Sequence, residues 1–183
     1  MCGICGIVDY NNNEIQSSEI DEMKTLIKHR GPDDDGSYIN HNLGLGFVRL
    51  SILDLTKSGH QPMHSADGRY VMVFNGEIFN YIELRNSLRA LGYTFRSNTD
   101  TEVLLNAYQE WGKEVLHKLN GMWAFTIYDQ QENTLFGARD RYGIKPFYYS
   151  YDSNRFVFAS EIPPILKTLN KNLLQMILQF SII

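Results

Sequence analysis

A thiol one residue from the amino terminus, followed by a short apolar run, constrains this chain more than any other feature. Cys2 precedes Gly-Ile-Cys-Gly-Ile, and residues 2–10 indicate a buried strand. Chain termini are mobile unless they are tied down, so the fold must hold this first strand in place. If the initiator Met1 is removed, which a small residue at position 2 permits, Cys2 carries both a thiol and a free α-amine. Their ordinary pKa values are about 8.5 and about 7.7–8.0, so the amine can accept the thiol proton without a separate histidine.

The spacing Cys2-x-x-Cys5 admits other interpretations. It matches a redox pair or half of a metal site. A redox pair normally sits at the start of a helix that follows a strand, and only Met1 precedes Cys2 here. A structural zinc site needs four ligands, whereas the chain has two cysteines. An ordinary buried cysteine after the initiator fits as well, so this stretch alone is only suggestive.

Composition excludes several classes of function. The 183 residues suffice for one well-packed domain and are few for two. A net charge of −4 gives no reason to expect nucleic acid or an anionic membrane as a partner. No apolar stretch is long enough to cross a bilayer, and the first residues lack the pattern of a signal peptide. Two cysteines fit a reducing compartment, so we expect a cytoplasmic protein.

The first half of the chain shows both helical and strand periodicity. Ser17 or Ser18 is expected to cap a helix that ends near His29. A loop is expected over residues 30–36, and a hairpin over 37–41 and 44–50. The stretch 58–68 is rich in turn formers. The apolar run Tyr70–Phe74 indicates a buried strand, which we expect to end in a turn at Asn75-Gly76-Glu77.

The second half begins with helices and ends as a meander of strands. Asn80 is expected to cap one helix, and Thr99 or Asp100 the next, with a short strand near Phe95 between them. A short helical segment is expected around residues 113–118. Four further strands are expected at 122–129, 134–139, 147–151 and 155–160. This order predicts an α+β fold in which antiparallel sheet packs between helices.

Four polar features suit a thiol that attacks an amide. Asn75-Gly76 offers two neutral oxyanion donors, a side-chain amide and a backbone N–H. Arg49 offers a fork for a carboxylate, and Glu77 and Asp100 offer negative charge to an ammonium group. Together they describe an α-amino acid with a side-chain amide, for which glutamine is the obvious candidate. Each feature alone has an ordinary alternative, namely surface salt bridges for Arg49 and Asp100 and a hairpin turn for Asn75-Gly76.

Six motifs share one register with a known family. They are Met1–Gly6, His29–Asp33, Arg49–Ile52, Phe74–Tyr81, Ser97–Glu102 and Ala138–Pro146. Over residues 2 to about 166 the chain thereby resembles class II glutamine amidotransferases, and above all the N-terminal domain of glutamine-hydrolysing asparagine synthetases.

The resemblance implies a fold, an activity and a set of site residues. The fold is that of N-terminal-nucleophile hydrolases, a four-layer αββα sandwich of antiparallel sheets, here a glutaminase domain at residues 2–166. The activity is hydrolysis of L-glutamine to glutamate and ammonia through a thioester on Cys2, with the oxyanion hole at Asn75 and Gly76. Arg49 is expected to hold the substrate carboxylate, and Glu77 and Asp100 the α-amino group. The backbone of Leu50, Ser51, Ile52 and Leu53 is expected to line the pocket.

The end of the chain departs from the family pattern. In the synthetases a longer ATP-using domain with a Ser-Gly-Gly pyrophosphate loop follows, and no such loop occurs in these 183 residues. We therefore expect no cofactor or metal for glutamine hydrolysis, with ATP and Mg needed only in a synthetase domain absent from this sequence. Pro163-Pro164 requires that any helix after Glu161 begins there. The apolar residues 167–183 are expected to begin a linker or an interface segment.

The expected partner is a synthetase subunit or domain, and a homo-oligomer is left open. Two rival functions also stay open at this point. One is a non-enzymatic, truncated or regulatory remnant that kept the fold. The other is an N-terminal-nucleophile hydrolase that acts on another amide.

Overall fold

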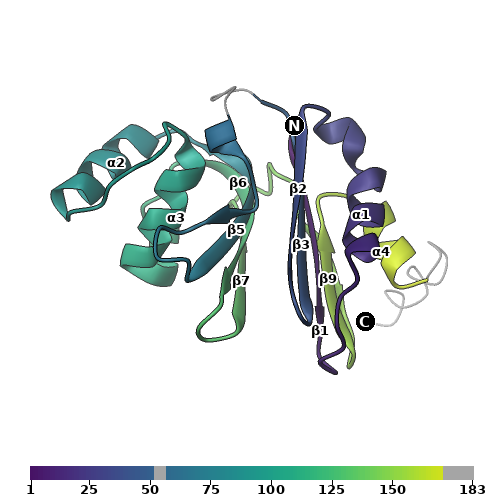
Figure 1. Ribbon diagram of the computed structural model, residues 1–183. Helices are drawn as coiled ribbons and strands as arrows, with labels where there is room; N and C mark the ends of the chain where they lie inside the picture. Colours follow the sequence, from purple (N-terminus) through teal and green to yellow (C-terminus); the bar gives the residue numbers. More distant parts are fainter. Residues whose placement is uncertain (52–56, 171–183) are drawn as a thin grey trace.

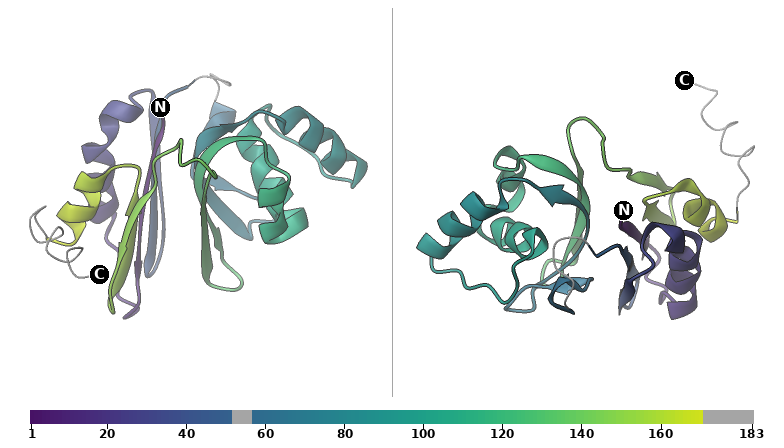
Figure 2. Two further views of the ribbon diagram at one scale, coloured as in Figure 1. Left: turned by 180° about the vertical axis from the view of Figure 1, so that it is seen from behind. Right: turned by 90° about the horizontal axis from the view of Figure 1, so that it is seen from above.

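The computed structural model describes residues 1–51 and 57–170. Two antiparallel sheets stack face to face, and a layer of helices covers the outer face of each sheet (Figure 1). Seen from above, the helical layers lie on opposite sides of the paired sheets (Figure 2). The expected four-layer αββα arrangement is confirmed.

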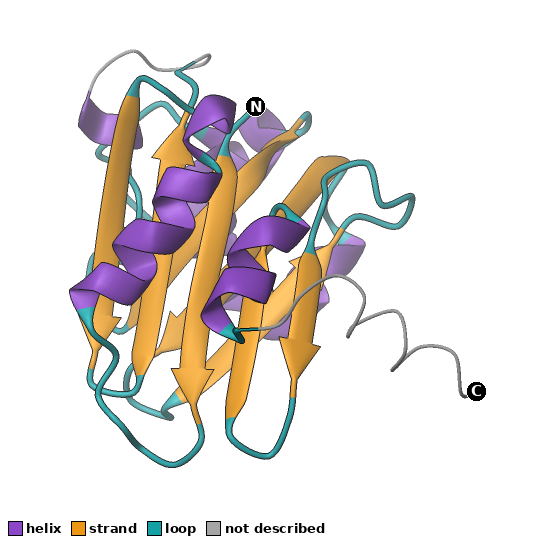
Figure 3. Ribbon diagram, turned by 90° about the vertical axis from the view of Figure 1, so that its right-hand side faces the viewer, coloured by secondary structure: helices purple, strands orange, loops and turns teal. Residues whose placement is uncertain are grey.

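The chain's first strand lies at the centre of the first sheet. Five strands run in the order β2 (Asp34–Asn40), β3 (Leu43–Arg49), β1 (Gly3–Asp9), β9 (Arg155–Ala159) and β8 (Tyr148–Tyr151). Strand β1 pairs antiparallel with β3 on one side and with β9 on the other. Helices α1 (Ser17–Leu26) and α4 (Ile162–Thr168) lie across the outer face of this sheet (Figure 3).

The second sheet has one long central pair and one very short edge strand. Its order is β4 (Met63–His64), β5 (Tyr70–Ile78), β6 (Gly121–Asp129) and β7 (Thr134–Arg139). Strand β4 pairs only with Val71 and Met72, so most of one edge of β5 has no neighbouring strand. Helices α2 (Tyr81–Ala90) and α3 (Asp100–Trp111) cover the outer face. Short 3₁₀ turns occur at Lys28–Arg30, Lys57–Gly59 and Gly112–His117.

Side-chain alternation assigns each strand residue to one of three cores. On β5, Met72 and Phe74 pack toward α2 and α3, whereas Val71 and Val73 pack against the other sheet. On β1, Cys5 and Ile7 pack toward α1 and α4, whereas Ile4 faces between the sheets. Because strand side chains alternate with period two, Cys2 and Asn75 both belong to the rows that face the space between the sheets.

Several local expectations differ from the structure. The residue before α1 is Gln16, whose N–H donates to Glu19 Oε2 at 3.1 Å, so neither Ser17 nor Ser18 is the cap. Strand β2 begins at Asp34 because Asp34–Gly36 pair with β3, where a loop was expected. The structure has no strand near Phe95. Asn80 is the residue before α2, as expected, and its carbonyl accepts from Leu84 N at 3.1 Å, but its side chain does not cap the helix. That side chain contacts the Lys118 carbonyl at 2.9 Å and the Asn120 N–H at 2.9 Å, and thereby ties α2 to the start of β6.

Two helix starts agree with the sequence. Thr99 caps α3 by accepting a hydrogen bond from Glu102 N at 3.3 Å. Pro163 and Pro164 occupy the first turn of α4, the only place where a helix tolerates them. Helix α4 ends at Thr168, and residues 171–183 lie outside the described part, so the division into a domain and a tail stays a prediction. Within the described ranges, no helix is long and apolar enough to span a membrane.

The core between the sheets should dominate stability. Phe158 is fully buried there, stacked on Phe147. Replacing Phe158 by alanine is expected to lower the free energy of unfolding by about 3–5 kcal/mol. Tyr142→Ala, at a side chain that is 90% exposed, is the control and should change it little. Denaturant unfolding measures both, and equal effects of the two changes would contradict this description of the core.

Candidate active site

Cys2 is held in place from two sides. The Arg30 Nε donates to the Cys2 carbonyl at 3.0 Å, and the same guanidinium pairs with Glu161 at 3.0 Å. Two residues after Cys2, Ile4 N donates to Ser160 Oγ at 3.0 Å, and Ser160 N donates to Ile4 O at 2.8 Å. Both tethers come from segments distant in the sequence. They give this terminus the fixed geometry that a catalytic group requires.

The Cys2 thiol lies against the end of β3. Leu50 N donates to Cys2 Sγ at 3.4 Å, and the thiol approaches the Leu50 carbonyl at 3.6 Å. Burial raises the pKa of the Cys2 thiol, while the Leu50 N–H, the amine of Met1, and the charges of Arg49 and Lys145 each oppose that rise. A base is therefore needed to take the thiol proton near neutral pH.

Cys5 does not share this site. It is fully buried in the core toward α1, where burial raises the pKa of its thiol to about 12. Cys2 instead packs against the core between the sheets. The two thiols are free and lie on opposite faces of the same strand segment. This separation speaks against the redox-pair and metal-site interpretations of the Cys-x-x-Cys spacing.

The open edge of β5 carries one uncapped N–H. Along this edge, Gln61 takes the place of a strand: its side chain accepts from Phe74 N at 2.6 Å and donates to Phe74 O at 3.2 Å. Two residues from Gly76 in the other direction, Ile78 N donates to Asp100 Oδ2 at 2.9 Å. Gly76 lies between them, and among the described residues no side chain caps its N–H.

The pairing with β6 fixes the direction of the Gly76 N–H. Gly76 pairs with Trp123, whose N–H and C=O both point the other way, to Asp140. In an antiparallel pair this makes Gly76 and Trp123 a non-hydrogen-bonded pair, so the Gly76 N–H points to the open edge. A Cβ at Gly76 would lie 2.4 Å from Met122 O, so this position has no room for a side chain.

The prediction of a turn at Asn75-Gly76-Glu77 was wrong. All three residues lie within β5 and pair with β6.

Asn75 carries a second unused donor. Its side chain is 2% exposed, and its Nδ2 has no hydrogen-bond partner among the residues that the structure describes. A buried amide without a partner is costly, and such groups require an explanation. An oxyanion formed between the sheets would supply the missing acceptor.

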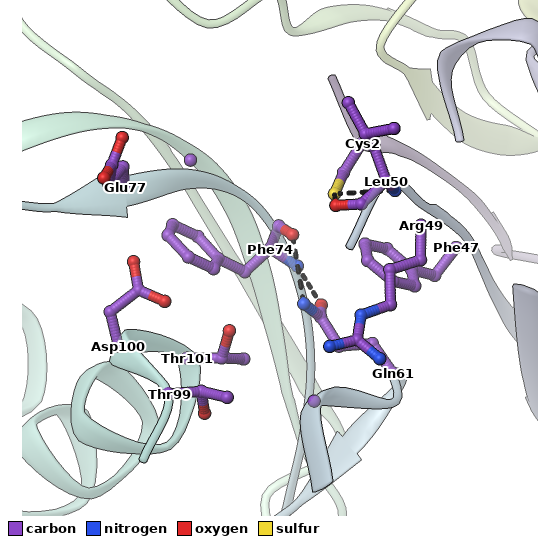
Figure 4. Close-up of a pocket in the computed structure, with 12 residues that line it drawn as sticks. Cys2, Phe47, Arg49, Leu50, Gln61, Phe74, Glu77, Thr99, Asp100 and Thr101 are labelled. Atoms are coloured by element: carbon purple, nitrogen blue, oxygen red, sulfur yellow. Dashed lines mark hydrogen bonds between the residues drawn. The ribbon is translucent and has the colours of Figure 1, made fainter. Parts of the chain in front are cut away.

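Arg49 lies on the first-sheet side of the pocket, below Cys2 and Leu50 in Figure 4. It is 7% exposed at the end of β3, and its carbonyl accepts from Asp33 N at 3.0 Å. Gly59 packs directly on the guanidinium, because a Cβ there would lie 2.2 Å from an Arg49 terminal nitrogen. The position of this cation therefore depends on glycine at residue 59.

Asp100 and Glu77 lie on the second-sheet side, beyond Phe74 from Arg49 (Figure 4). Burial raises the pKa of Asp100 to about 6; the N–H groups of Ile78 and Thr101 oppose this rise, and Glu77 adds to it. The pocket thus has one cation on one wall and two acids on the other. This arrangement matches a zwitterionic α-amino acid.

One pocket unites most of the residues expected from the sequence and several that were missed. Cys2, Arg49, Leu50, Gly76, Glu77 and Asp100 line it, and Asn75 lies buried beside them in β5. Ser51 is fixed next to it, since Ser51 N donates to Asp33 Oδ2 at 2.8 Å, whereas Ile52 and Leu53 lie outside the described residues. Three further lining residues, Phe74, Thr99 and Thr101, lie within the motifs Phe74–Tyr81 and Ser97–Glu102, although no role at the site was expected for them. No signal in the sequence pointed to the other three, which are Phe47, Gly59 and Gln61.

A solved structure has the same fold as this chain. A glutamine phosphoribosylpyrophosphate amidotransferase from B. subtilis superposes with a TM-score of 0.77 at 21% identity, covering 92% of this chain and 44% of that one. At that identity the likeness concerns the fold alone, which is that of the N-terminal-nucleophile hydrolases.

The sequence comparison narrows the class to a family. The sequence model of the glutamine amidotransferase domain family matches residues 1–182 of this chain. The chain therefore belongs to this family. A putative glutamine-hydrolysing asparagine synthetase of Methanocaldococcus jannaschii is 44% identical over 93% of the chain. Asparagine synthetase 1 of Bacillus subtilis is 42% identical over 100% of it. The chain spans 36% and 30% of these relatives, about a third of their length, and is homologous to the N-terminal domain of such synthetases.

The packing of Gly59 on Arg49 predicts a binding defect. In Gly59→Ala the added methyl displaces the guanidinium, so we expect weaker glutamine binding with a smaller effect on the chemical step. Steady-state kinetics should show a raised KM and a smaller change in kcat. Gly137→Ala is the matched control, since its methyl would meet nothing closer than 3.5 Å. A KM for Gly59→Ala equal to that of the control would contradict the assignment.

The raised pKa of Asp100 predicts pH-dependent binding. Asp100 is ionised above its pKa of about 6 and neutral below it, so its attraction for an ammonium group is lost as pH falls. In a Cys2→Ala background, chosen because it lacks the thiol, the Kd for glutamine should rise roughly tenfold per pH unit below that point. Calorimetric titration measures it. Adding Asp100→Asn should weaken binding and remove this dependence; a Kd that is flat in the presence of Asp100 would exclude its proposed role.

Proposed function

We propose that this chain hydrolyses the side-chain amide of L-glutamine to glutamate and ammonia through a thioester on Cys2. The observation that carries the proposal is the arrangement of three groups at one pocket. The tethered Cys2 and Gly76, with its uncapped N–H, line the pocket, and Asn75, whose amide is unpartnered, lies buried beside Gly76 in β5. Membership of the glutamine amidotransferase family supports it.

The pocket walls supply substrate recognition. Arg49 binds the α-carboxylate through its guanidinium fork, and Asp100 with Glu77 binds the α-ammonium group. Leu50 lines the wall beside the thiol. The expected contribution of the backbone of Ser51, Ile52 and Leu53 stays a prediction. Holding both ends of the amino acid places its side-chain amide carbon near the Cys2 sulfur.

The chemistry then needs one base and one oxyanion hole. After removal of Met1, the α-amine of Cys2 takes the thiol proton, and sulfur attacks the amide carbon. Asn75 Nδ2 and Gly76 N donate to the oxyanion of the tetrahedral intermediate. The protonated α-amine of Cys2 then donates this proton to the leaving nitrogen of the substrate amide. Ammonia departs, and the thioester remains on Cys2. Water, deprotonated by the same amine, attacks the thioester and releases glutamate and free Cys2.

The fate of the ammonia is part of the proposal. The relatives are glutamine-hydrolysing asparagine synthetases about three times as long as this chain. We propose that the domain supplies nitrogen to a synthetase-like domain or subunit, where ATP and Mg act, and that glutamine hydrolysis itself uses no cofactor. A substrate profile separates this activity from hydrolysis of another amide, since analogues without the α-amine or α-carboxylate should be rejected. A protein that releases no ammonia from glutamine would favour the non-enzymatic alternative.

The two cysteines should respond differently to substitution. Cys2→Ala removes the nucleophile and should abolish ammonia release. Cys5→Val replaces a small buried side chain in the core toward α1 and should retain most activity. A coupled glutaminase assay measures both, with thermal melting to verify that each variant folds. Loss of activity in folded Cys5→Val would contradict the assignment of a single catalytic thiol.

Asn75→Ala tests the oxyanion hole. Removal of one donor of this kind lowers turnover on the order of 10²–10³-fold. Because Asn75 contacts the oxyanion and not the ends of the amino acid, kcat should fall much more than KM rises. Arg49→Lys should instead raise KM much more than it lowers kcat, because lysine keeps the charge but lacks the two-pronged guanidinium that binds a carboxylate. Near-normal kcat in folded Asn75→Ala would exclude Asn75 from the oxyanion hole.

A further inference from the structure

The loop between β7 and β8 brings a buried lysine to the amino terminus. Lys145 is 8% exposed, and its Nζ lies 3.7 Å from the Sδ of Met1. Lysine is rarely buried to this extent unless it is paired. This residue belongs to the motif Ala138–Pro146, to which the proposed hydrolysis assigns no role.

The loop is built to fix the lysine in position. Asp140 accepts four backbone hydrogen bonds, from Trp123, Tyr142, Ile144 and Lys145 itself. The Arg139 guanidinium donates to the Lys145 carbonyl at 2.6 Å and to the Gly143 carbonyl at 2.5 Å. Gly143 has φ +63°, a left-handed conformation that favours glycine. A loop held by so many bonds presents the Lys145 side chain in a defined direction.

No acid in the described part of the chain forms an ion pair with the Lys145 ammonium. Asp140 receives the backbone N–H of Lys145, and Glu161 pairs with Arg30 and His29 on the other side of Cys2. The charged groups that act on the Cys2 thiol are the amine of Met1, Arg49 from β3, and Lys145, of which Arg49 and Lys145 remain when Met1 is removed. The environment of the terminus is thus predominantly positive.

We propose that Lys145 is a positioning residue for the reaction, whose ammonium keeps the α-amine of mature Cys2 in its neutral form and favours the Cys2 thiolate. The inference rests on the proposed role of that amine as the base. Removal of Met1 takes away the thioether beside Lys145 Nζ. A nearby like charge disfavours protonation of an amine, and a nearby opposite charge favours a thiolate. Both effects prepare Cys2 to react near neutral pH.

The test compares three variants in a Cys5→Val background, in which Cys2 is the one thiol. Lys145→Met removes the charge but keeps a side chain of similar length, and Lys145→Arg keeps the charge. Lys167→Met, at a lysine side chain that is 59% exposed on α4, controls for the loss of a positive charge elsewhere. Intact mass verifies that Met1 is absent, and thermal melting verifies that each variant folds. If Lys145→Met fails to fold, Lys145→Gln takes its place.

Two readouts are used. The first is the rate of Cys2 alkylation by iodoacetamide as a function of pH, which does not depend on turnover. At about pH 7, Lys145→Met should be alkylated roughly three- to tenfold more slowly, equivalent to a shift of about half to one pKa unit. The second is the pH profile of kcat/KM for glutamine, whose acidic limb should move to higher pH by a similar amount. Lys145→Arg and Lys167→Met should have the same alkylation rate and the same acidic limb of kcat/KM as the parent protein.

The outcomes separate this inference from the proposed function. Slower alkylation in Lys145→Met, restored in Lys145→Arg, supports it even if glutamine is not hydrolysed, in which case the proposed function alone fails. If glutamine is hydrolysed but Lys145→Met leaves the alkylation rate and the acidic limb unmoved, the inference is overturned. A uniform loss of kcat/KM at every pH would likewise overturn it, because that result describes a packing role.

Discussion

The central position of β1 in its sheet is the constraint on which the whole site depends. A strand at the chain terminus has few ways to be fixed, and here it pairs on both sides, with β3 and with β9. Arg30 and Ser160 then hold the backbone of Cys2 and Ile4 from outside the strand. The backbone of Cys2 is therefore immobilised, as the proposed mechanism requires of one residue that provides both nucleophile and base.

The two sheets contribute different halves of the chemistry. In the proposed reaction the first sheet provides the thiol and Arg49, and the second provides the two oxyanion donors and the acids that bind the ammonium group. The short β4 makes this possible, because it leaves the edge of β5 without a strand beyond Met72. Gln61 and Asp100 satisfy the donors on either side of Gly76, so one N–H of a regular strand stays available at the pocket.

Sequence patterns predicted the strands and helices well, because alternation and helical spacing are local. The resemblance to a family predicted the layers, and it named six of the residues that line the pocket, whose roles stay a proposal. Local signals failed where tertiary contacts decide. Asn75-Gly76-Glu77 has the composition of a turn, yet pairing with β6 keeps it extended. Gly59 and Gln61 lie in a stretch rich in turn formers, and their roles depend on Arg49 and Phe74, which are distant in sequence. No local pattern encodes such contacts.

The central claim is that Cys2, as the first residue of the mature chain, attacks the amide carbon of glutamine. A glutamine analogue with an electrophilic diazoketone in place of the amide tests it most directly. Intact-mass and peptide analysis should find a chain without Met1 that carries one adduct on Cys2, and free glutamine should slow its formation. An adduct on Cys5, or labelling at the same rate with Met1 retained, would contradict the account.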